Sequence, residues 1–149
     1  MGINQYTIDV KRRNIWQLLI LYSCLLFYAV FLTPNRYDGG TSTHINIIPL
    51  LKTAKRFFER GDEHFWPYYI EYWGNIFGNI LLFIPFGFLL KCLYPQQSSV
   101  RLCAYGCLLS ICIELIQFSL QIGVCDIDDV ILNVIGTAAG IYLCRFIRS

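Results

Sequence analysis

The sequence predicts an all-α membrane protein with about four transmembrane helices in a compact bundle. Of its 149 residues, 56% are hydrophobic and 15% are charged, whereas soluble domains carry about 45–50% and about 25%. The mean hydropathy is +0.50. Four apolar stretches approach the length of about 20 residues that a bilayer span requires. The net charge of +2 is small, and the basic residues flank these stretches. This distribution argues against nucleic-acid binding.

We predict spans at about residues 14–33, 75–94, 100–122 and 128–146. All four belong to one domain that covers residues 1–149. The first span follows a basic run at 11–13 and stops at Pro34. Because its apolar run is long and no small-residue cleavage site follows, we interpret it as an uncleaved anchor. In the second span neighbouring helices can satisfy the backbone groups that Pro85 frees. Lys91, near the end of that span, can extend its ammonium to the interface.

The long loop at 34–74 is expected to carry an interfacial helix. Residues 50–60 place apolar side chains on one helical face and most of the charged ones on the other, which is typical of a helix lying in the plane of a membrane surface. Aromatic residues then lead to the second span, as in an aromatic belt: Trp66, Tyr68, Tyr69, Tyr72 and Trp73.

The distribution of basic residues predicts the orientation. An even number of spans puts both termini on one side, and most basic residues close to span ends are expected on that side. Basic residues near spans favour the cytoplasm. We therefore predict cytoplasmic termini and an extracytoplasmic loop at 34–74.

Polar residues interrupt the last three spans at one depth. They are Asn75, Asn79, Glu114, Gln117, Asp126, Asp128, Asp129 and Asn133. Such groups are costly in a bilayer and usually face the interior of the bundle. Three pairs lie three or four residues apart, which places each pair on one helix face: Asn75 with Asn79, Glu114 with Gln117, and Asp129 with Asn133. The predicted topology puts all of them near the outer ends of the spans, and the sequence therefore predicts an outward-facing polar site.

The chemistry of these residues leaves alternatives open. Asp126 or Asp128 can cap the fourth helix, and the amides can simply bond between helices. Glu114 and Asp129 are candidates for a general acid/base pair. The three carboxylates of Asp126, Asp128 and Asp129 are candidate ligands of a divalent cation such as Mg²⁺ or Ca²⁺. The seven cysteines and two histidines lack zinc spacing, and no cofactor is predicted.

Three segments carry a resemblance to a known family: residues 46–50 (NIIPL), 78–90 and 114–140. The chain resembles the VanZ-like family of small bacterial membrane proteins, whose founding member is associated with resistance to teicoplanin. The positions that match are Asn46, Pro49, Asn79, Pro85, Gly87, Glu114, Gln117, Asp126, Asp129, Asn133 and Gly136. The resemblance adds Asn46 to the candidate ligand-binding residues. Many relatives carry an arginine shortly before the acidic cluster, but residues 121–125 contain none here.

The resemblance implies a multi-pass protein of the bacterial cell membrane, surrounded by lipid. The first hypothesis is a non-enzymatic envelope protein that binds a cell-wall precursor or a lipoglycopeptide, and so contributes to teicoplanin-type resistance or to envelope homeostasis. The second is an intramembrane enzyme that acts on a lipid-linked or head-group substrate with Glu114 and Asp129 as acid and base. The third is an accessory protein of assembly or transport.

Overall fold

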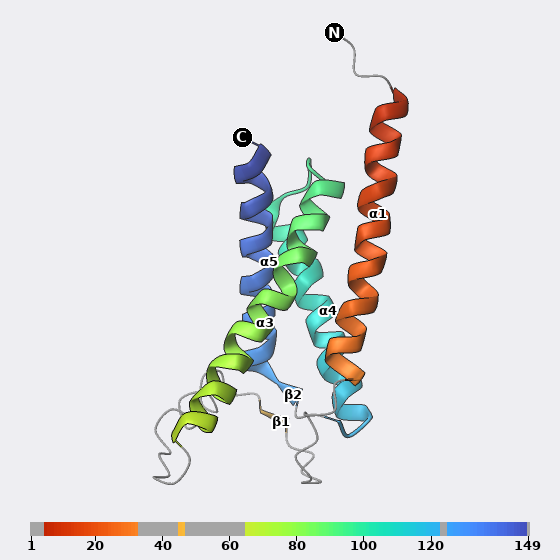
Figure 1. The fold of residues 1–149 in the computed structure, drawn as a ribbon. Helices are drawn as coiled ribbons and strands as arrows, with labels where there is room; N and C mark the ends of the chain where they lie inside the picture. Colours follow the sequence, from red (N-terminus) through yellow and green to blue (C-terminus); the bar gives the residue numbers. More distant parts are fainter. Residues whose placement is uncertain (1–4, 33–44, 47–64, 123–124, 149) are drawn as a thin grey trace.

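The computed structural model describes residues 5–32, 45–46, 65–122 and 125–148. Its helices are α1 (Gln5–Phe27), which continues into the π-helical turn η1 (Tyr28–Leu32), α3 (Phe65–Leu93), α4 (Ser99–Ser119) and α5 (Ile127–Arg148). The strands β1 (Ile45–Asn46) and β2 (Cys125–Asp126) have two residues each (Figure 1). Four helical segments of 21 or 22 residues are long and apolar enough to cross a membrane. The predicted all-α membrane fold is therefore confirmed.

Helix α3 is longer than its predicted span. It begins at Phe65 and has 29 residues, whereas hydropathy placed its start near Asn75. At about 1.5 Å per residue it is about 43 Å long, more than the roughly 30 Å of a hydrocarbon core. Its apolar segment is Trp73–Leu93, so the aromatic-rich residues 65–72 continue the helix beyond that segment. The interfacial helix expected at 50–60 lies outside the described residues.

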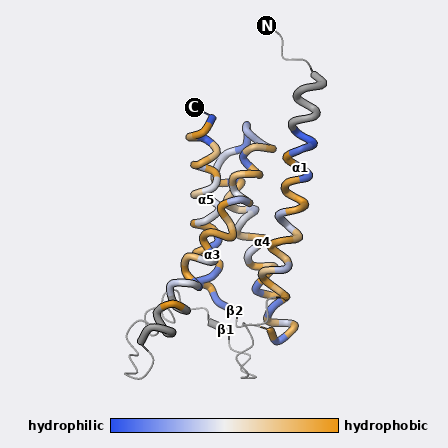
Figure 2. Tube along the Cα trace, in the orientation of Figure 1, coloured by the Kyte–Doolittle hydropathy of each residue, from blue (hydrophilic) through white to orange (hydrophobic). Residues whose placement is uncertain are grey.

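Successive helices alternate in direction, so that α3 and α5 run parallel to each other. The start of α1 and the end of α5 lie at one end of the bundle and the strands at the other (Figure 1). Hydrophobic residues dominate along the helices, and hydrophilic ones gather around β2 and the start of α5 (Figure 2). The end with the termini is called the terminal end below, and the end with the strands is called the strand end. This arrangement puts the first parts of α3 and α5 and the last part of α4 at the strand end.

Helices α3 and α5 pack backbone against backbone. A methyl group on Gly136 would collide with the carbonyl oxygen of Ile80, and one on Gly140 would collide with that of Ile84. No side chain can stand between the helices at these two positions. Small residues four apart allow such close approach in membrane bundles. In the sequence this spacing predicts tight packing both here and at Gly74 and Gly78, and the structure confirms it for Gly136 and Gly140.

The other glycine pair does not pack in this way. A methyl group on Gly74 or Gly78 would meet no atom within 4 Å in the described part of the protein. In Figure 1 the lower part of α3 leans away from α5. The packing role expected of this pair is therefore wrong, because the spacing occurs where the two helices have already separated.

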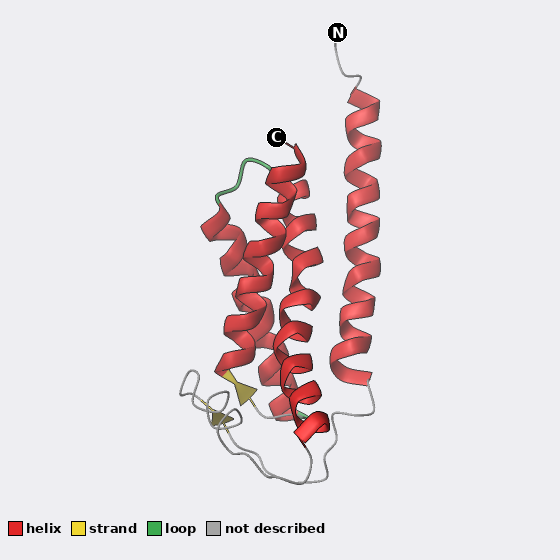
Figure 3. Ribbon diagram, turned by 60° about the vertical axis from the view of Figure 1, so that its left-hand side comes forward, coloured by secondary structure: helices red, strands yellow, loops and turns green. Residues whose placement is uncertain are grey.

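Helix α1 joins the bundle through its second half. Leu26 and Val30 are buried in a cluster with Phe83 and Ile113, and the hydroxyl of Tyr22 donates to the carbonyl oxygen of Leu82. The rest of α1 diverges from the other helices in both views (Figures 1 and 3). The large exposed apolar side chains of α1 are Trp16, Leu18, Ile20, Leu21, Leu25 and Phe27. The compact part of the bundle is therefore formed by α3, α4 and α5.

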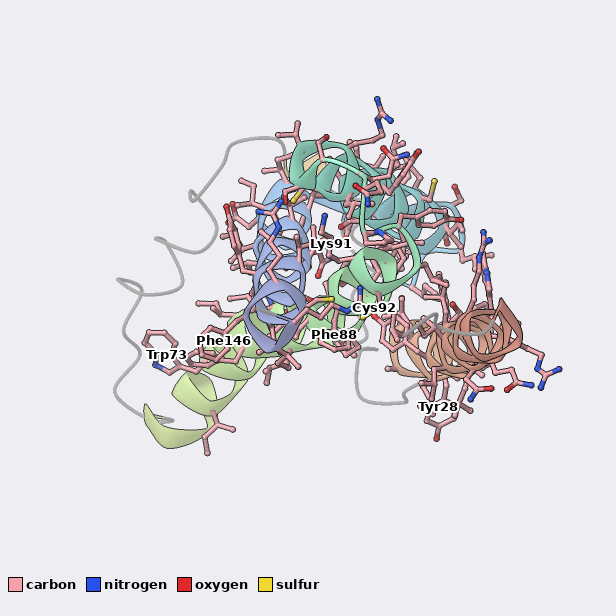
Figure 4. All side chains as sticks on the ribbon, turned by 90° about the horizontal axis from the view of Figure 1, so that it is seen from above. Tyr28, Trp73, Phe88, Lys91, Cys92 and Phe146 are labelled. Carbon is pink, nitrogen blue, oxygen red and sulfur yellow. The ribbon has the colours of Figure 1, made fainter. Side chains whose placement is uncertain are left out.

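Lys91 closes the turn between α3 and α4 at the terminal end. Its side chain is 7% exposed, and its ammonium donates to the carbonyl oxygens of Pro95 at 2.8 Å and Gln97 at 2.9 Å. Figure 4, which looks down on this end, shows Lys91 among the last three helices. The ammonium therefore folds back onto the turn, whereas the sequence suggested that it extends to the interface.

Exchanging Gly140 for alanine should destabilise the protein. The added methyl group collides with backbone atoms of α3, and overpacking of this kind costs about 1–3 kcal/mol, more than the roughly 1 kcal/mol that alanine gains over glycine in a helix. The matched control is Gly78→Ala, whose methyl group meets open space. Thermal unfolding of both variants in detergent checks this, and equal midpoints would contradict the close contact.

Candidate functional site: a polar layer

The strand end of the bundle holds a group of polar side chains that we call the polar layer. Its members are Asn75, Asn79, Ser110, Glu114, Gln117, Asp126, Asp128, Asp129 and Asn133, from α3, α4, β2 and α5. Six of the residues predicted from the sequence are only 4–6% exposed: Asn79, Glu114, Gln117, Asp126, Asp128 and Asn133. Buried polar groups require partners, and most of the layer's hydrogen bonds connect different elements.

Asp129 fixes the start of α5 against α3. Its Oδ1 accepts hydrogen bonds from Nδ2 of Asn79 at 2.6 Å and from Nδ2 of Asn75 at 3.2 Å. The two asparagines lie four residues apart, so both point from one face of α3. The sequence placed these three residues at one depth, and the structure shows that they contact one another.

Glu114 holds strand β2 against α4. Its Oε2 accepts the backbone N–H of Asp126 at 2.9 Å, and its side chain is 4% exposed. A carboxylate in an apolar span needs such a partner. The bond connects the end of α4 to the chain just before α5, so Glu114 positions the connection between the two helices.

The strand pair brings Asn46 to the polar layer. β1 and β2 run parallel, with Ile45 opposite Cys125 and Asn46 opposite Asp126. Residues that lie 80 positions apart in the chain therefore meet through their main chains at the strand end. The resemblance included Asn46 among the candidate residues, and the structure places its backbone beside Asp126.

Asp126 also caps helix α5. Its Oδ1 accepts the backbone N–H of Asp128 at 3.1 Å, which is the bond that an N-cap residue makes to the first turn of a helix. Asp128 and Asp129 lie in that first turn, where carboxylates complement the helix dipole. The structure therefore supports the capping role that the sequence left open for Asp126.

Gln117 joins α4 to the end of the first helix. Its Nε2 donates to the carbonyl oxygen of Val30 at 3.2 Å. Val30 lies in the last turn of η1, where carbonyl groups have no partner within their own helix. The amide therefore satisfies a backbone group that lipid would leave without one.

Asn133 lies one turn deeper along α5. Its Nδ2 donates to Oγ of Ser110 at 2.8 Å, and its backbone carbonyl accepts from Oγ1 of Thr137 at 2.9 Å. Its Oδ1 is buried and has no hydrogen-bond partner among the described residues, which is uncommon for a buried polar atom. Ser110 and Thr137 escaped the sequence analysis, although each lies four residues from a predicted member, Glu114 and Asn133.

The carboxylates do not converge on a common point. Among the described residues no three acidic, histidine or cysteine side chains are grouped as a metal site requires. Asp126 faces the amide of Asp128, while Asp129 faces the asparagines of α3. This arrangement gives no support to a divalent-cation site at Asp126, Asp128 and Asp129. Glu114 and Asp129 take part in separate hydrogen bonds, the first to β2 and the second to α3.

Cys125, in β2, lies next to the acidic side chains. Burial raises the pKa of its thiol, and the negative charges of Glu114 and Asp126 raise that pKa further. A thiolate, not a thiol, is the reactive form of cysteine. Cys125 is therefore expected to be a slow nucleophile at neutral pH.

Alkylation of Cys125 should report the charge of Glu114. In the native protein the rate of alkylation by iodoacetamide should begin to rise at a higher pH than it does for an ordinary thiol. The reason is that the thiolate of Cys125 forms only at higher pH. Glu114→Gln removes a negative charge and should move this profile to lower pH. Asp128→Asn, which removes a charge that does not raise this pKa, is the matched control. Peptide-resolved mass spectrometry gives the profiles, and identical profiles for wild type and Glu114→Gln would contradict the proximity.

Replacing Asn79 by leucine should lower stability more than the same change at Asn75. Asn79 is 6% exposed and makes the shorter bond to Asp129, so its loss removes a buried partner of a carboxylate, at a cost of about 1–3 kcal/mol. Asn75 is less buried and its bond is longer. Thermal midpoints in detergent should fall in that order, and the reverse order would contradict the geometry.

A family model described as VanZ/LLP1 matches residues 18–148, from within α1 to the end of α5. The chain is also similar to Protein VanZ of Enterococcus faecium, with 40% identity over 65 residues. That match covers 44% of this chain and 40% of the relative, so it spans less than half of either protein. No solved structure matches the chain. Because the family model covers most of the chain and every described helix of the polar layer, this protein belongs to the VanZ/LLP1 family.

Proposed function

We propose that this protein is a non-enzymatic component of the bacterial envelope whose polar layer binds an envelope ligand. Through that binding it contributes to teicoplanin-type glycopeptide resistance or to envelope homeostasis. The observation that carries the proposal is the meeting of α3, α4, α5 and the strand pair in one buried polar layer. Family membership supports the envelope setting.

The bonds of the polar layer favour a rigid binding surface. Glu114 holds the backbone of β2, and Gln117 holds the end of η1. These bonds fix the chain where it enters and leaves the helices, which are the parts that face the membrane surface. A surface held in this way binds a ligand with little loss of conformational entropy. The layer therefore favours recognition of a head group over simple packing of helices.

The side-chain oxygen of Asn133 supports the same interpretation. Among the residues that the structure describes it has no hydrogen-bond partner, and burying an amide oxygen in this way costs free energy. A hydrogen-bond donor of a bound ligand removes that cost, and so does a bound water molecule until a ligand replaces it. The polar layer thus retains hydrogen-bonding capacity of its own.

Charge at the terminal end supports the orientation. Exposed arginines lie there at the start of the apolar segment of α1, at the start of α4 and at the end of α5: Arg12, Arg13, Arg101, Arg145 and Arg148. Basic residues close to spans favour the cytoplasm. With the termini inside, the polar layer faces the outer surface of the membrane, where lipid-linked wall precursors and glycopeptides meet. Such ligands combine a polar group with a lipid tail, and apolar side chains are exposed along all four helices.

An enzymatic role for Glu114 and Asp129 is the second candidate. Both carboxylates lie at membrane depth on neighbouring helices, which suits proton transfer to a lipid-linked substrate. However, one oxygen of Glu114 already holds the amide of Asp126, and one oxygen of Asp129 holds two asparagines. These bonds give the carboxylates positioning tasks, and we therefore rank binding above catalysis and an accessory role third.

Drug susceptibility tests the proposal. A glycopeptide-sensitive Gram-positive host expresses wild type, Glu114→Gln or Asp129→Asn at matched membrane abundance. The control is Val100→Ala, an exposed position at the start of α4, at the other end of the bundle from these bonds. Wild type and Val100→Ala should raise the inhibitory concentration of teicoplanin. The two layer variants should lose most of this protection, because loss of a charged hydrogen bond costs about 1.5–3 kcal/mol, roughly tenfold or more in binding.

Other outcomes separate the alternatives. No protection by wild type would reject the resistance role. Equal protection by all variants would favour the accessory role, in which the carboxylates only pack. Chemical change of a lipid-linked precursor by purified wild type, lost in both layer variants, would establish the enzymatic role in place of binding.

A further inference from the structure

Two cysteines face each other at the terminal end of the bundle. Sγ of Cys92, on α3, lies 3.1 Å from Sγ of Cys144, on α5. Both are free thiols. Cys144 is fully buried, while Cys92 is partly exposed. Figure 4 shows Cys92 beside Lys91 at the end of α3.

The glycine contacts between α3 and α5 hold these sulfur atoms together. Cys144 lies one turn beyond Gly140, where an added methyl group would collide with the backbone of Ile84. Cys92 lies five residues beyond Gly87, where an added methyl group would collide with the backbone of Thr137. Helices in backbone contact have little room to move apart. A disulfide has sulfur atoms about 2.05 Å apart, so the two sulfurs need to approach by only about 1 Å.

We propose that Cys92 and Cys144 form a redox modification site, at which a peroxide converts the thiol pair into an intramolecular disulfide. Because the thiolate is the reactive form of cysteine, Cys92 first loses its proton. Its partly exposed sulfur then attacks a peroxide oxygen, the O–O bond breaks, and a sulfenic acid and one water form. The sulfur of Cys144 then attacks that of Cys92. The S–S bond forms, the S–O bond breaks, and the hydroxyl leaves with the thiol proton as a second water. Two sulfur atoms are oxidised by one electron each, and hydrogen peroxide is reduced to two waters.

Position singles out this pair. Cys24 and Cys112 are exposed on the outer surfaces of α1 and α4, and Cys125 lies at the strand end. Within the described ranges the structure brings no other two sulfur atoms into contact. A resolving cysteine next to an accessible one is the arrangement that favours reversible oxidation over irreversible damage.

The disulfide would fasten the helix pair that supports the polar layer. At the strand end α3 and α5 are joined by Asp129 and the two asparagines. Oxidation would add a covalent link at the terminal end, so that both ends of the interface are fixed. This inference does not depend on the ligand or on the proposed resistance role.

Peroxide treatment of the purified full chain in nanodiscs tests the proposal. Intact mass should show the loss of two hydrogen atoms, and a non-reduced peptide digest should contain the peptides of Cys92 and Cys144 linked. The midpoint of thermal unfolding should rise by about 5 °C or more, and dithiothreitol should reverse both changes. Cys92→Ser and Cys144→Ser should each abolish the linked peptide, whereas the matched control Cys103→Ser should retain it.

Three outcomes would overturn the proposal. The first is a peroxide-treated wild type in which Cys92 carries sulfinic acid and no linked peptide appears. The second is a disulfide that joins other cysteines at an equal or higher rate. The third is equal loss of the linked peptide in Cys103→Ser. Because the wild-type digest alone decides the first two outcomes, the test stands even where a serine variant fails to fold.

Discussion

The backbone contact between α3 and α5 at Gly136 and Gly140 determines the rest of the arrangement. Because no side chain separates the helices there, residues one or two turns away on either side are also forced together. Toward the strands this brings Asp129 to the asparagines of α3, and toward the termini it brings Cys144 to Cys92. One interface therefore supports both the polar layer and the thiol pair.

A bilayer offers no water to backbone groups, so helix ends and connections must find partners within the protein. Three of the polar side chains meet this demand directly. Glu114 accepts an N–H of β2, Gln117 donates to a carbonyl at the end of η1, and Asp126 caps α5. The polar residues that are costly to place in lipid are thus those that bond to helix ends and connections. A binding surface can develop at such a place, because polar groups are already assembled there.

Hydropathy was sufficient to predict the four spans, because a segment can span a bilayer if it is long enough and sufficiently apolar. It could not find the start of α3 at Phe65, because the helix continues through aromatic residues beyond its apolar segment. The predicted topology placed Asn79 and Asp129 at one depth, but only packing decides that they bond. The pairing of Asn46 with Asp126 had no local signal, because two-residue strands show no alternation. Glycine spacing was right at Gly136 and misleading at Gly78, where the helices have separated.

The way α1 attaches has a consequence for how its sequence can drift. Two hydrogen bonds that join α1 and η1 to the bundle each involve a main-chain carbonyl: Tyr22 donates to that of Leu82, and Gln117 donates to that of Val30. Every residue type has such a carbonyl, so exchange of Val30 for another apolar residue of similar size keeps the acceptor. The donors Tyr22 and Gln117 have no such freedom. Evolutionary constraint on this helix therefore falls on a few donor and packing positions, and the lipid-facing residues between them are free to vary so long as they stay apolar.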